Sequence, residues 1–204
     1  MDCLEKYFNL TENQKELFTK FKDVFLWYNQ RINLISRKDA DYLCVKHILH
    51  SLSIAKFIDF KSAKIVDVGT GGGLPGIPLA IMFPEAEFFL IDSIGKKISA
   101  VNDIIDKLEL KNVVAQQKRS PEIKQKFDYV VARAVTNFPK FYQDVKHLVR
   151  RGQAGNRKNG IIYLKGGDFS EEIQNYKSNI KIVEIDDFFW EDFFISKKII
   201  HFIF

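Results

Sequence analysis

One segment constrains the chain more than any other: residues 65–76, Ile-Val-Asp-Val-Gly-Thr-Gly-Gly-Gly-Leu-Pro-Gly. An apolar run with β-branched residues surrounds an acid, Asp67, and four glycines follow within five positions. Glycine permits positive φ and lets a ligand approach the backbone closely, and unpaired N–H groups at a helix start attract anionic ligand groups. The segment therefore predicts a strand, a tight turn and a helix start that together bind a nucleotide-like cofactor.

Two cofactors compete for this loop. Residues 71–76 fit the G-x-G-x-x-G fingerprint of dinucleotide-binding proteins. Asp67 argues against a dinucleotide, because a carboxylate two residues before the first glycine repels a pyrophosphate. That carboxylate suits S-adenosylmethionine, which carries an ammonium, a sulfonium and a ribose but no phosphate. Asp92 ends the next apolar run, where its carboxylate can accept hydrogen bonds from both ribose hydroxyls.

Strands and helices alternate from residue 64 onward. We expect strands at residues 64–68, 88–92, 113–116, 129–132, 161–164, 181–188 and 197–204. Helices are expected at about 75–82, 96–108, 138–148 and 170–177. The alternation predicts an α/β fold with a parallel sheet, helices on both faces and an antiparallel final strand. This order is similar to the Rossmann-like seven-stranded sheet of class I S-adenosylmethionine-dependent methyltransferases.

Residues 1–60 precede the first strand and look helical. Thr11 and Gln14 fit a capping box, and apolar residues then recur at helical spacing. A second helix is expected from about 41 to 57. So much apolar surface predicts a helical extension, residues 1–60, that packs on a methyltransferase domain, residues 61–204, and walls the cofactor cleft.

The charge and the cysteines bear on partners and location. Net charge is +5, and basic pairs such as Lys96-Lys97 and Lys118-Arg119 fall near expected loops. Such pairs attract a polyanion, although they also fit simple solubility. No bilayer-spanning run or signal peptide is evident, so we expect a cytoplasmic protein without membrane contact. Cys3 and Cys44 predict neither a disulfide framework nor a metal site, and Cys44 is expected to pack as a small apolar side chain.

Six motifs extend along nearly the whole chain, at residues 28–34, 46–52, 67–80, 90–97, 132–134 and 164–166. Together they resemble the GidB family, the ribosomal small-subunit methyltransferases G. Leu-Pro-Gly-Ile-Pro at residues 74–78 is more specific than the glycines alone. The resemblance implies methyl transfer from S-adenosylmethionine to N7 of one guanine in 16S ribosomal RNA, as free RNA or in a small-subunit particle.

The chain departs from the family pattern in three places. His50 stands where the family usually has Asp, and Gly72 occupies a position that is often Pro. A basic stretch, residues 150–158, is added before the fifth expected strand. None of these departures touches the acids of the cofactor motif.

Strand ends and the resemblance together give the candidate site residues. The catalytic candidates are Arg133 and Asn33. The cofactor-binding candidates are Asp67, Gly69, Thr70, Gly71, Gly73, Leu74, Asp92, Ser93, Gln117 and Arg133. The RNA-binding candidates are Lys46, His47, Lys96, Lys97, Arg119 and Lys165, and no metal is expected.

The two catalytic candidates each have an alternative interpretation. The fork of Arg133 suits a phosphate or a guanine edge, but the residue can equally form an ion pair at a strand end. Asn33 can contact the base or the methionine moiety, or it can cap a helix. N7 of guanine has a free lone pair, so its methylation needs positioning and no general base.

Other functions stay open on the sequence alone. A methyltransferase that acts on another RNA is the nearest alternative, and a dinucleotide-dependent oxidoreductase is more distant. A non-catalytic RNA-binding module on the same scaffold is a third. We expect a monomer.

Overall fold

The computed structural model describes residues 2–133 and 135–204 and has a seven-stranded sheet at its centre. The strand order is β3-β2-β1-β4-β5-β7-β6. The strands are β1 Lys64–Val68, β2 Glu87–Asp92, β3 Val113–Gln117, β4 Tyr129–Arg133, β5 Gly160–Gly166, β6 Ile180–Glu184 and β7 Lys197–Ile203. β1 to β5 pair in parallel, and β7 lies antiparallel between β5 and β6. The predicted fold class is confirmed.

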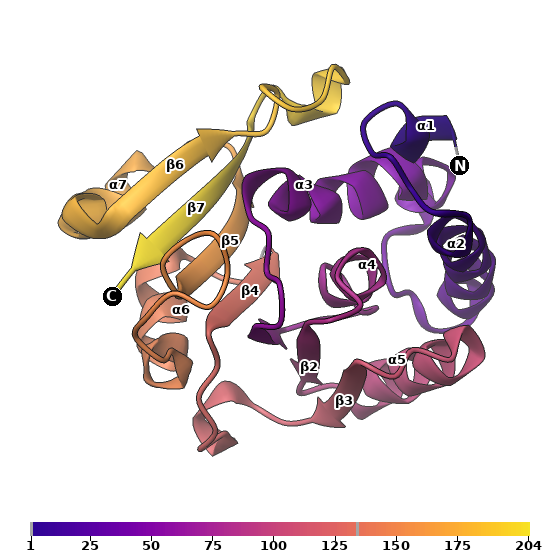
Figure 1. Cartoon of the computed structure of the whole chain (residues 1–204), viewed down its shortest axis with the longest axis horizontal. Helices are drawn as coiled ribbons and strands as arrows, with labels where there is room; N and C mark the ends of the chain where they lie inside the picture. Colours follow the sequence, from indigo (N-terminus) through magenta and orange to yellow (C-terminus); the bar gives the residue numbers. More distant parts are fainter. Residues whose placement is uncertain (1, 134) are drawn as a thin grey trace.

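Helices cover both faces of the sheet. The α-helices are α1 Asp2–Glu5, α2 Glu12–Ile32, α3 His50–Phe57, α4 Gly76–Met82, α5 Gly95–Leu108, α6 Phe138–Val145 and α7 Ser170–Ile173. Figure 1 shows α2 to α5 on one side of the sheet and α6 and α7 on the other. Short 3-10 segments are η1 Arg37–Tyr42, η3 Ser120–Glu122, η4 Lys146–Leu148, η5 Gln174–Asn179 and η6 Asp192–Phe194, and η2 Leu43–Leu49 is a π-helix.

Each face of the sheet has its own hydrophobic core, and β1 contributes to both. Ile65 belongs to the core beneath α2 to α5, whereas Val66 and Val68 belong to the core beneath α6 and α7. Because side chains alternate along a strand, Asp67 shares the face of Ile65. The buried acid therefore points toward α4 and the glycine loop that precedes it.

The N-terminal helices share the core of this first face. Thr11 caps α2 in the predicted capping box with Gln14. The side chains of Phe18, Phe21 and Phe25 in α2 are fully buried. The ring of Phe25 lies against the glycine loop, since a Cβ on Gly72 would stand 2.7 Å from Cε2 of Phe25. A small residue at position 72 thus allows α2 to contact the loop directly.

Four expected elements differ from the structure in their extent. The helices expected at 138–148 and 170–177 end as α-helices at Val145 and Ile173 and continue as the 3-10 segments η4 and η5. Residues 41–57 do not form one helix, because the chain passes from 3-10 through π to α geometry before Phe57. The apolar spacing did not reveal this, since wider and narrower turns present similar faces over one or two turns. The sixth strand ends at Glu184, not at residue 188, because the amides of Phe188 and Phe189 both turn back to the carbonyl of Ile185.

The expectation for the cysteines was wrong. Cys3 in α1 and Cys44 in η2 form a disulfide across 41 residues of sequence, with their Cα atoms 6.7 Å apart. The pairing depends on the packing of α1 against η2, which no local pattern reveals. It ties the N-terminal helix to the segment that precedes α3.

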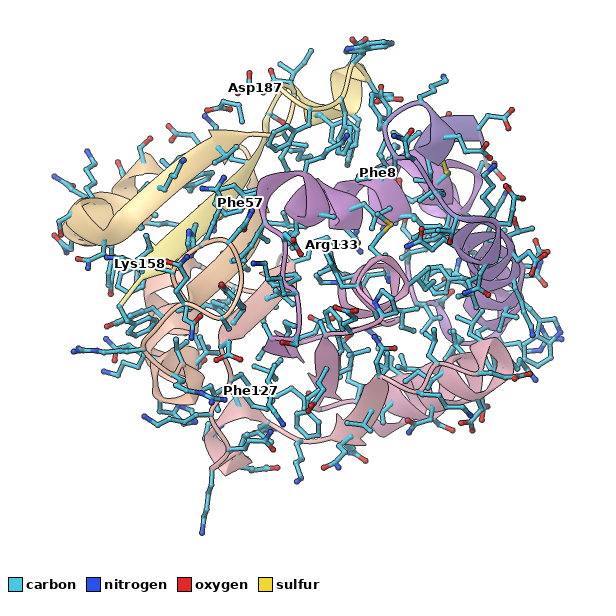
Figure 2. All side chains as sticks on the ribbon, in the orientation of Figure 1. Phe8, Phe57, Phe127, Arg133, Lys158 and Asp187 are labelled. Carbon is cyan, nitrogen blue, oxygen red and sulfur yellow. A yellow bond between two sulfur atoms is a disulfide. The ribbon has the colours of Figure 1, made fainter. Side chains whose placement is uncertain are left out.

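The basic stretch at residues 150–158 lies at the amino ends of the parallel strands. Nε of Arg150 is 3.4 Å from Oδ1 of Asp128, and Nε of Arg157 donates to the carbonyl of Phe57 at 2.6 Å. The guanidinium of Arg157 also lies over the Phe57 ring, which Figure 2 labels beside α3. These arginines hold a connection together at the edge opposite the cofactor loop.

No helix in residues 2–133 and 135–204 is both long and apolar enough to cross a membrane. This finding concerns helical spans alone.

We expect the Phe25→Ala variant to lower the free energy of unfolding by about 3–5 kcal/mol, because it empties a fully buried site between α2 and the glycine loop. Urea unfolding followed by circular dichroism measures the change. Lys20→Ala, an exposed position on the same helix, is the matched control and should shift the free energy by less than about 0.5 kcal/mol. Equal stabilities for the two variants would show that α2 does not depend on this contact.

Candidate functional site

A cleft of about 550 Å³ opens at the carboxyl ends of β1, β2 and β4. Ligands of open α/β sheets bind at this edge, where the strand order reverses on either side of β1. The lining residues come from the ends of β1, β2 and β4, from the connections after β1 to β4, and from α6: Val68, Gly69, Ile91, Asp92, Ser93, Lys118, Arg119, Ser120, Pro121, Arg133, Val135 and Asp144.

Asp67 lies in β1, beneath this edge of the sheet, and has no solvent-exposed surface. Its Oδ2 accepts from the hydroxyl of Thr70 at 2.6 Å and from the amide of Gly76 at 2.8 Å. Its Oδ1 has no partner. Burial raises the pKa of Asp67 to about 7, against the two hydrogen bonds and the charge of Arg133, which lower it. Buried acceptors usually have a partner, so Oδ1 of Asp67 is a candidate contact for a cationic or hydrogen-donating ligand group.

The glycines of the loop are required by conformation and by space. Gly69, Gly71 and Gly73 all have positive φ, between 58° and 88°. At Gly76 the constraint is contact, because a Cβ would stand 2.8 Å from Oδ2 of Asp67. Any side chain there would displace the carboxylate that organises the loop.

Asp92 links the loop to the end of β2. Its Oδ2 accepts from the amide of Gly71 and its Oδ1 from the amide of Ile94, both at 2.9 Å. Each carboxylate oxygen keeps a further lone pair, and Asp92 lines the cleft. Nearby, Nε2 of Gln117 donates to the carbonyl of Ser93 at 3.1 Å and fixes the turn after β2.

Arg133 ends β4 and reaches the interior between α3 and α4, as Figure 2 shows. Its Nη1 donates to the backbone carbonyl of Lys46 in a long hydrogen bond of 3.5 Å. Burial lowers the pKa of Arg133 to about 10, and the nearby charge of Asp67 opposes that shift. The guanidinium is therefore charged at neutral pH, and it lines the cleft. Among the described residues no carboxylate forms an ion pair with it, and Asp67 and Asp39 act on its pKa through space.

His47 lies beside Arg133 and is uncharged at neutral pH. Burial first, and then the charge of Arg133, lowers the pKa of His47 to about 4. Neither ring nitrogen has a hydrogen-bond partner. His47 is therefore uncharged at neutral pH in the ligand-free protein, and its predicted contact with RNA stays a prediction.

The structure brings some of the predicted site residues together at the cleft. Gly69, Asp92, Ser93, Arg119 and Arg133 line it. The remaining cofactor candidates lie at or under its edge: Asp67, Thr70, Gly71, Gly73, Leu74 and Gln117. Their roles stay predictions.

Other predicted residues lie elsewhere or have partners already. Asn33 is the C-cap of α2, in the left-handed region with φ 49°, which is the alternative that the sequence left open. Nζ of Lys165 is 2.6 Å from Glu172, and Nζ of Lys46 is 3.2 Å from Asp39. Lys96 and Lys97 stand at the start of α5, next to the cleft residue Ser93.

Two charged residues of the cleft, Lys118 and Asp144, are not among the predicted site residues, although Lys118 belongs to one of the basic pairs that the sequence shows. Lys118 follows β3 directly, so its place at a strand end was a usable signal. Asp144 comes from α6, and nothing in the sequence directs that helix face toward the cleft. Within the described ranges, no cluster of three or more His, Cys, Asp or Glu side chains is arranged to hold a metal ion.

The fold and the cleft define a class of protein: the class I, Rossmann-like methyltransferases. A solved structure described as an S-adenosylmethionine-dependent methyltransferase from Aquifex aeolicus is similar to this chain with a TM-score of 0.56, at 15% identity, over 79% of this chain and 93% of that one. At that identity the likeness concerns the fold alone.

The sequence identifies the family. Residues 14–198 match the family described as GidB, rRNA small subunit methyltransferase G. A Flavobacterium johnsoniae protein named ribosomal RNA small subunit methyltransferase G is 50% identical over 98% of this chain and 97% of its own length. A Christiangramia forsetii protein of the same name is 47% identical over 98% and 96%. The chain belongs to the GidB family.

We expect the stability of the ligand-free protein to fall between pH 5 and pH 8 through Asp67. The folded-state pKa of about 7 lies above the ordinary value of 3.8, so folding favours the protonated acid. This contribution is fully present below about pH 4 and is lost as the pH rises through about 7. Urea unfolding at pH 5, 6, 7 and 8 measures it.

The control for this prediction is Asp67→Asn, which cannot titrate. The wild-type protein should lose stability relative to the variant as the pH rises. Parallel pH profiles for the two proteins would mean that Asp67 is ionised throughout.

Proposed function

We propose that this protein transfers a methyl group from S-adenosylmethionine to N7 of a specific guanine in 16S ribosomal RNA. The observation that carries the proposal is the buried, half-satisfied carboxylate of Asp67 beside Asp92 and Arg133, in a chain of the GidB family. A pyrophosphate has no place beside Asp67, so a dinucleotide-dependent oxidoreductase receives no support.

The charged groups of the cleft complement the charged groups of S-adenosylmethionine. Of the groups that line the cleft, the remaining lone pairs of Asp92 suit the ribose hydroxyls and the guanidinium of Arg133 suits the carboxylate. The unpartnered Oδ1 of Asp67, which suits the ammonium, lies buried beneath the cleft. When bound, the cofactor supplies an electrophilic methyl group on its sulfonium. The residues of this chain orient the methyl group and exclude water, and they need not remove a proton from N7.

Cations around the cleft suit a polyanionic substrate. Lys96, Lys97, Lys118 and Arg119 have no ion pair in the described part of the chain and lie at the carboxyl edge of the sheet. We propose that these four contact RNA phosphates. Lys46 and Lys165 form ion pairs with Asp39 and Glu172, which would have to break before either lysine contacts a phosphate. We therefore propose the other four residues as the main RNA contacts.

We also propose that residues 1–60 act as a helical extension that walls the cofactor cleft of a domain at residues 61–204. The contacts of Arg133 with Lys46 and of Phe25 with Gly72 support this division of roles. Because the proposed substrate is ribosomal RNA or a small-subunit particle, we place the protein in the cytoplasm, as a monomer.

A methyl-transfer assay tests the function directly. The protein is incubated with labelled S-adenosylmethionine and unmodified 16S RNA or small-subunit particles, and the product is mapped. We expect label at the ring nitrogen of a single guanine. Cofactor binding without label on any ribosomal substrate would redirect the search to other RNAs, beginning with transfer RNA.

The Asp92→Asn variant should raise the Kd for S-adenosylmethionine by roughly 10- to 100-fold, because it removes a charged acceptor from the proposed ribose contact. Isothermal titration calorimetry measures the Kd. Asp106→Asn makes the same charge change at an exposed position on α5 and should leave the Kd unchanged. Similar affinities for the two variants would remove Asp92 from the cofactor site.

The double variant Lys96→Ala/Lys97→Ala should reduce the slope of log K for 16S RNA against log salt by about 1.5, because each phosphate contact contributes about 0.7–0.9. Binding at 50 to 300 mM salt supplies the slope. Lys124→Ala/Lys126→Ala, exposed on the connection that leads to the opposite end of the sheet, is the matched control. An equal change in both double variants would show a diffuse charge effect rather than contacts at α5.

A further inference from the structure

The π-helix η2 leaves the backbone carbonyl of Lys46 available to the side chain of Arg133. The amide of His50 donates to the carbonyls of Val45 and His47 and bypasses that of Lys46. The carbonyl of Lys46 instead accepts from Nη1 of Arg133 at 3.5 Å. π-turns are uncommon and alter the helical hydrogen-bond ladder, so this local change gives Arg133 a partner that a regular helix would keep for itself.

His50 contacts the same carbonyl with its side chain. An interaction of the ring with the carbonyl of Lys46 raises the pKa of His50 and so opposes the effect of burial, and Nε2 has no partner. A ring with its proton on Nδ1 is the tautomer that can donate to this carbonyl. The rings of Phe193 and Phe194 meet His50 edge-on at 5.6 and 6.1 Å between centroids. His50 is therefore held in a closed apolar setting, with one polar contact.

This setting keeps His50 uncharged. Burial, and then the charge of Arg133, holds the pKa of His50 well below its ordinary value. An imidazolium at this place would repel the guanidinium. An uncharged ring supports the shared carbonyl and leaves the charge of Arg133 available to a ligand.

We propose that His50 is a positioning residue, which fixes the Lys46 carbonyl so that the guanidinium of Arg133 faces the carboxylate of the cofactor. This inference rests on the proposed function. A guanidinium has five N–H donors, and within the described residues only one of those of Arg133 has a hydrogen-bond partner. Its orientation thus depends on a single long hydrogen bond, and the remaining donors are free to bind a carboxylate in a fork.

Two ligands and two variants test the proposal. S-adenosylmethionine has the carboxylate, whereas 5′-methylthioadenosine keeps the adenosine and the methylthio group, as a neutral thioether, and lacks the amino-acid part. His50→Leu removes the donor from a site of similar volume, and His50→Asn returns an N–H donor at the position of Nδ1. Calorimetry measures the Kd of each ligand with each protein.

We expect His50→Leu to weaken S-adenosylmethionine about tenfold and to leave 5′-methylthioadenosine within about twofold. His50→Asn should restore S-adenosylmethionine to within about threefold of the wild type. In the methyl-transfer assay, KM for the cofactor should rise with kcat nearly unchanged. Unchanged affinity for S-adenosylmethionine in His50→Leu, or equal weakening of both ligands, would overturn the proposal.

Two controls keep the test decisive. His201 is also buried with a pKa lowered to about 4, but it contacts Lys158 at the far end of the sheet, so His201→Leu should change stability and not the ligand preference. If His50→Leu does not fold, His50→Gln replaces it, since its amide reaches the position of Nε2 and not that of Nδ1. If the wild-type protein binds neither ligand, the proposed function is overturned as well. If the wild-type protein binds S-adenosylmethionine and the Kd does not change in His50→Leu, this inference alone is overturned.

Discussion

The hydrogen bonds of one buried carboxylate organise the functional edge of this protein. Asp67 joins the end of β1 to the first turn of α4 through the amide of Gly76, and to the loop between them through Thr70. Burying a carboxylate is costly unless its oxygens find donors, and here one oxygen finds two while the other finds none. The loop conformation and the position of α4 both depend on the two hydrogen bonds of the first oxygen.

Much of the fold was predictable because its signals are local. Alternating apolar segments located all seven strands, and the acid followed by glycines located the turn at the edge of the sheet. The errors arise where a residue's partner lies far away in sequence. The disulfide of Cys3 depends on η2, and the place of Asp144 depends on the orientation of α6.

The sequence predicts the residues of the cofactor motif better than it predicts their surroundings. Asp67, Asp92 and the glycines lie beside one another because parallel strands end at one edge, which the sequence order implies. The surroundings of Arg133 are different. Its partner is a backbone carbonyl in η2, and a backbone group carries no residue-specific signal. Asn33 is a second case. The sequence allowed either a ligand contact or a helix C-cap at this position, and the structure shows the C-cap, with a left-handed backbone.

The position of β7 has a consequence for how the chain is made. β7 is synthesised after every other strand, yet it lies between β5 and β6, and Phe193 and Phe194 just before it enclose His50. On the ribosome, a nascent chain that already carries the entire glycine loop still lacks the strand that covers the edge of β5, and an uncovered edge is open to wrong pairing. The contacts of Phe193 and Phe194 with His50 therefore form only when residues 193–203 have left the exit tunnel.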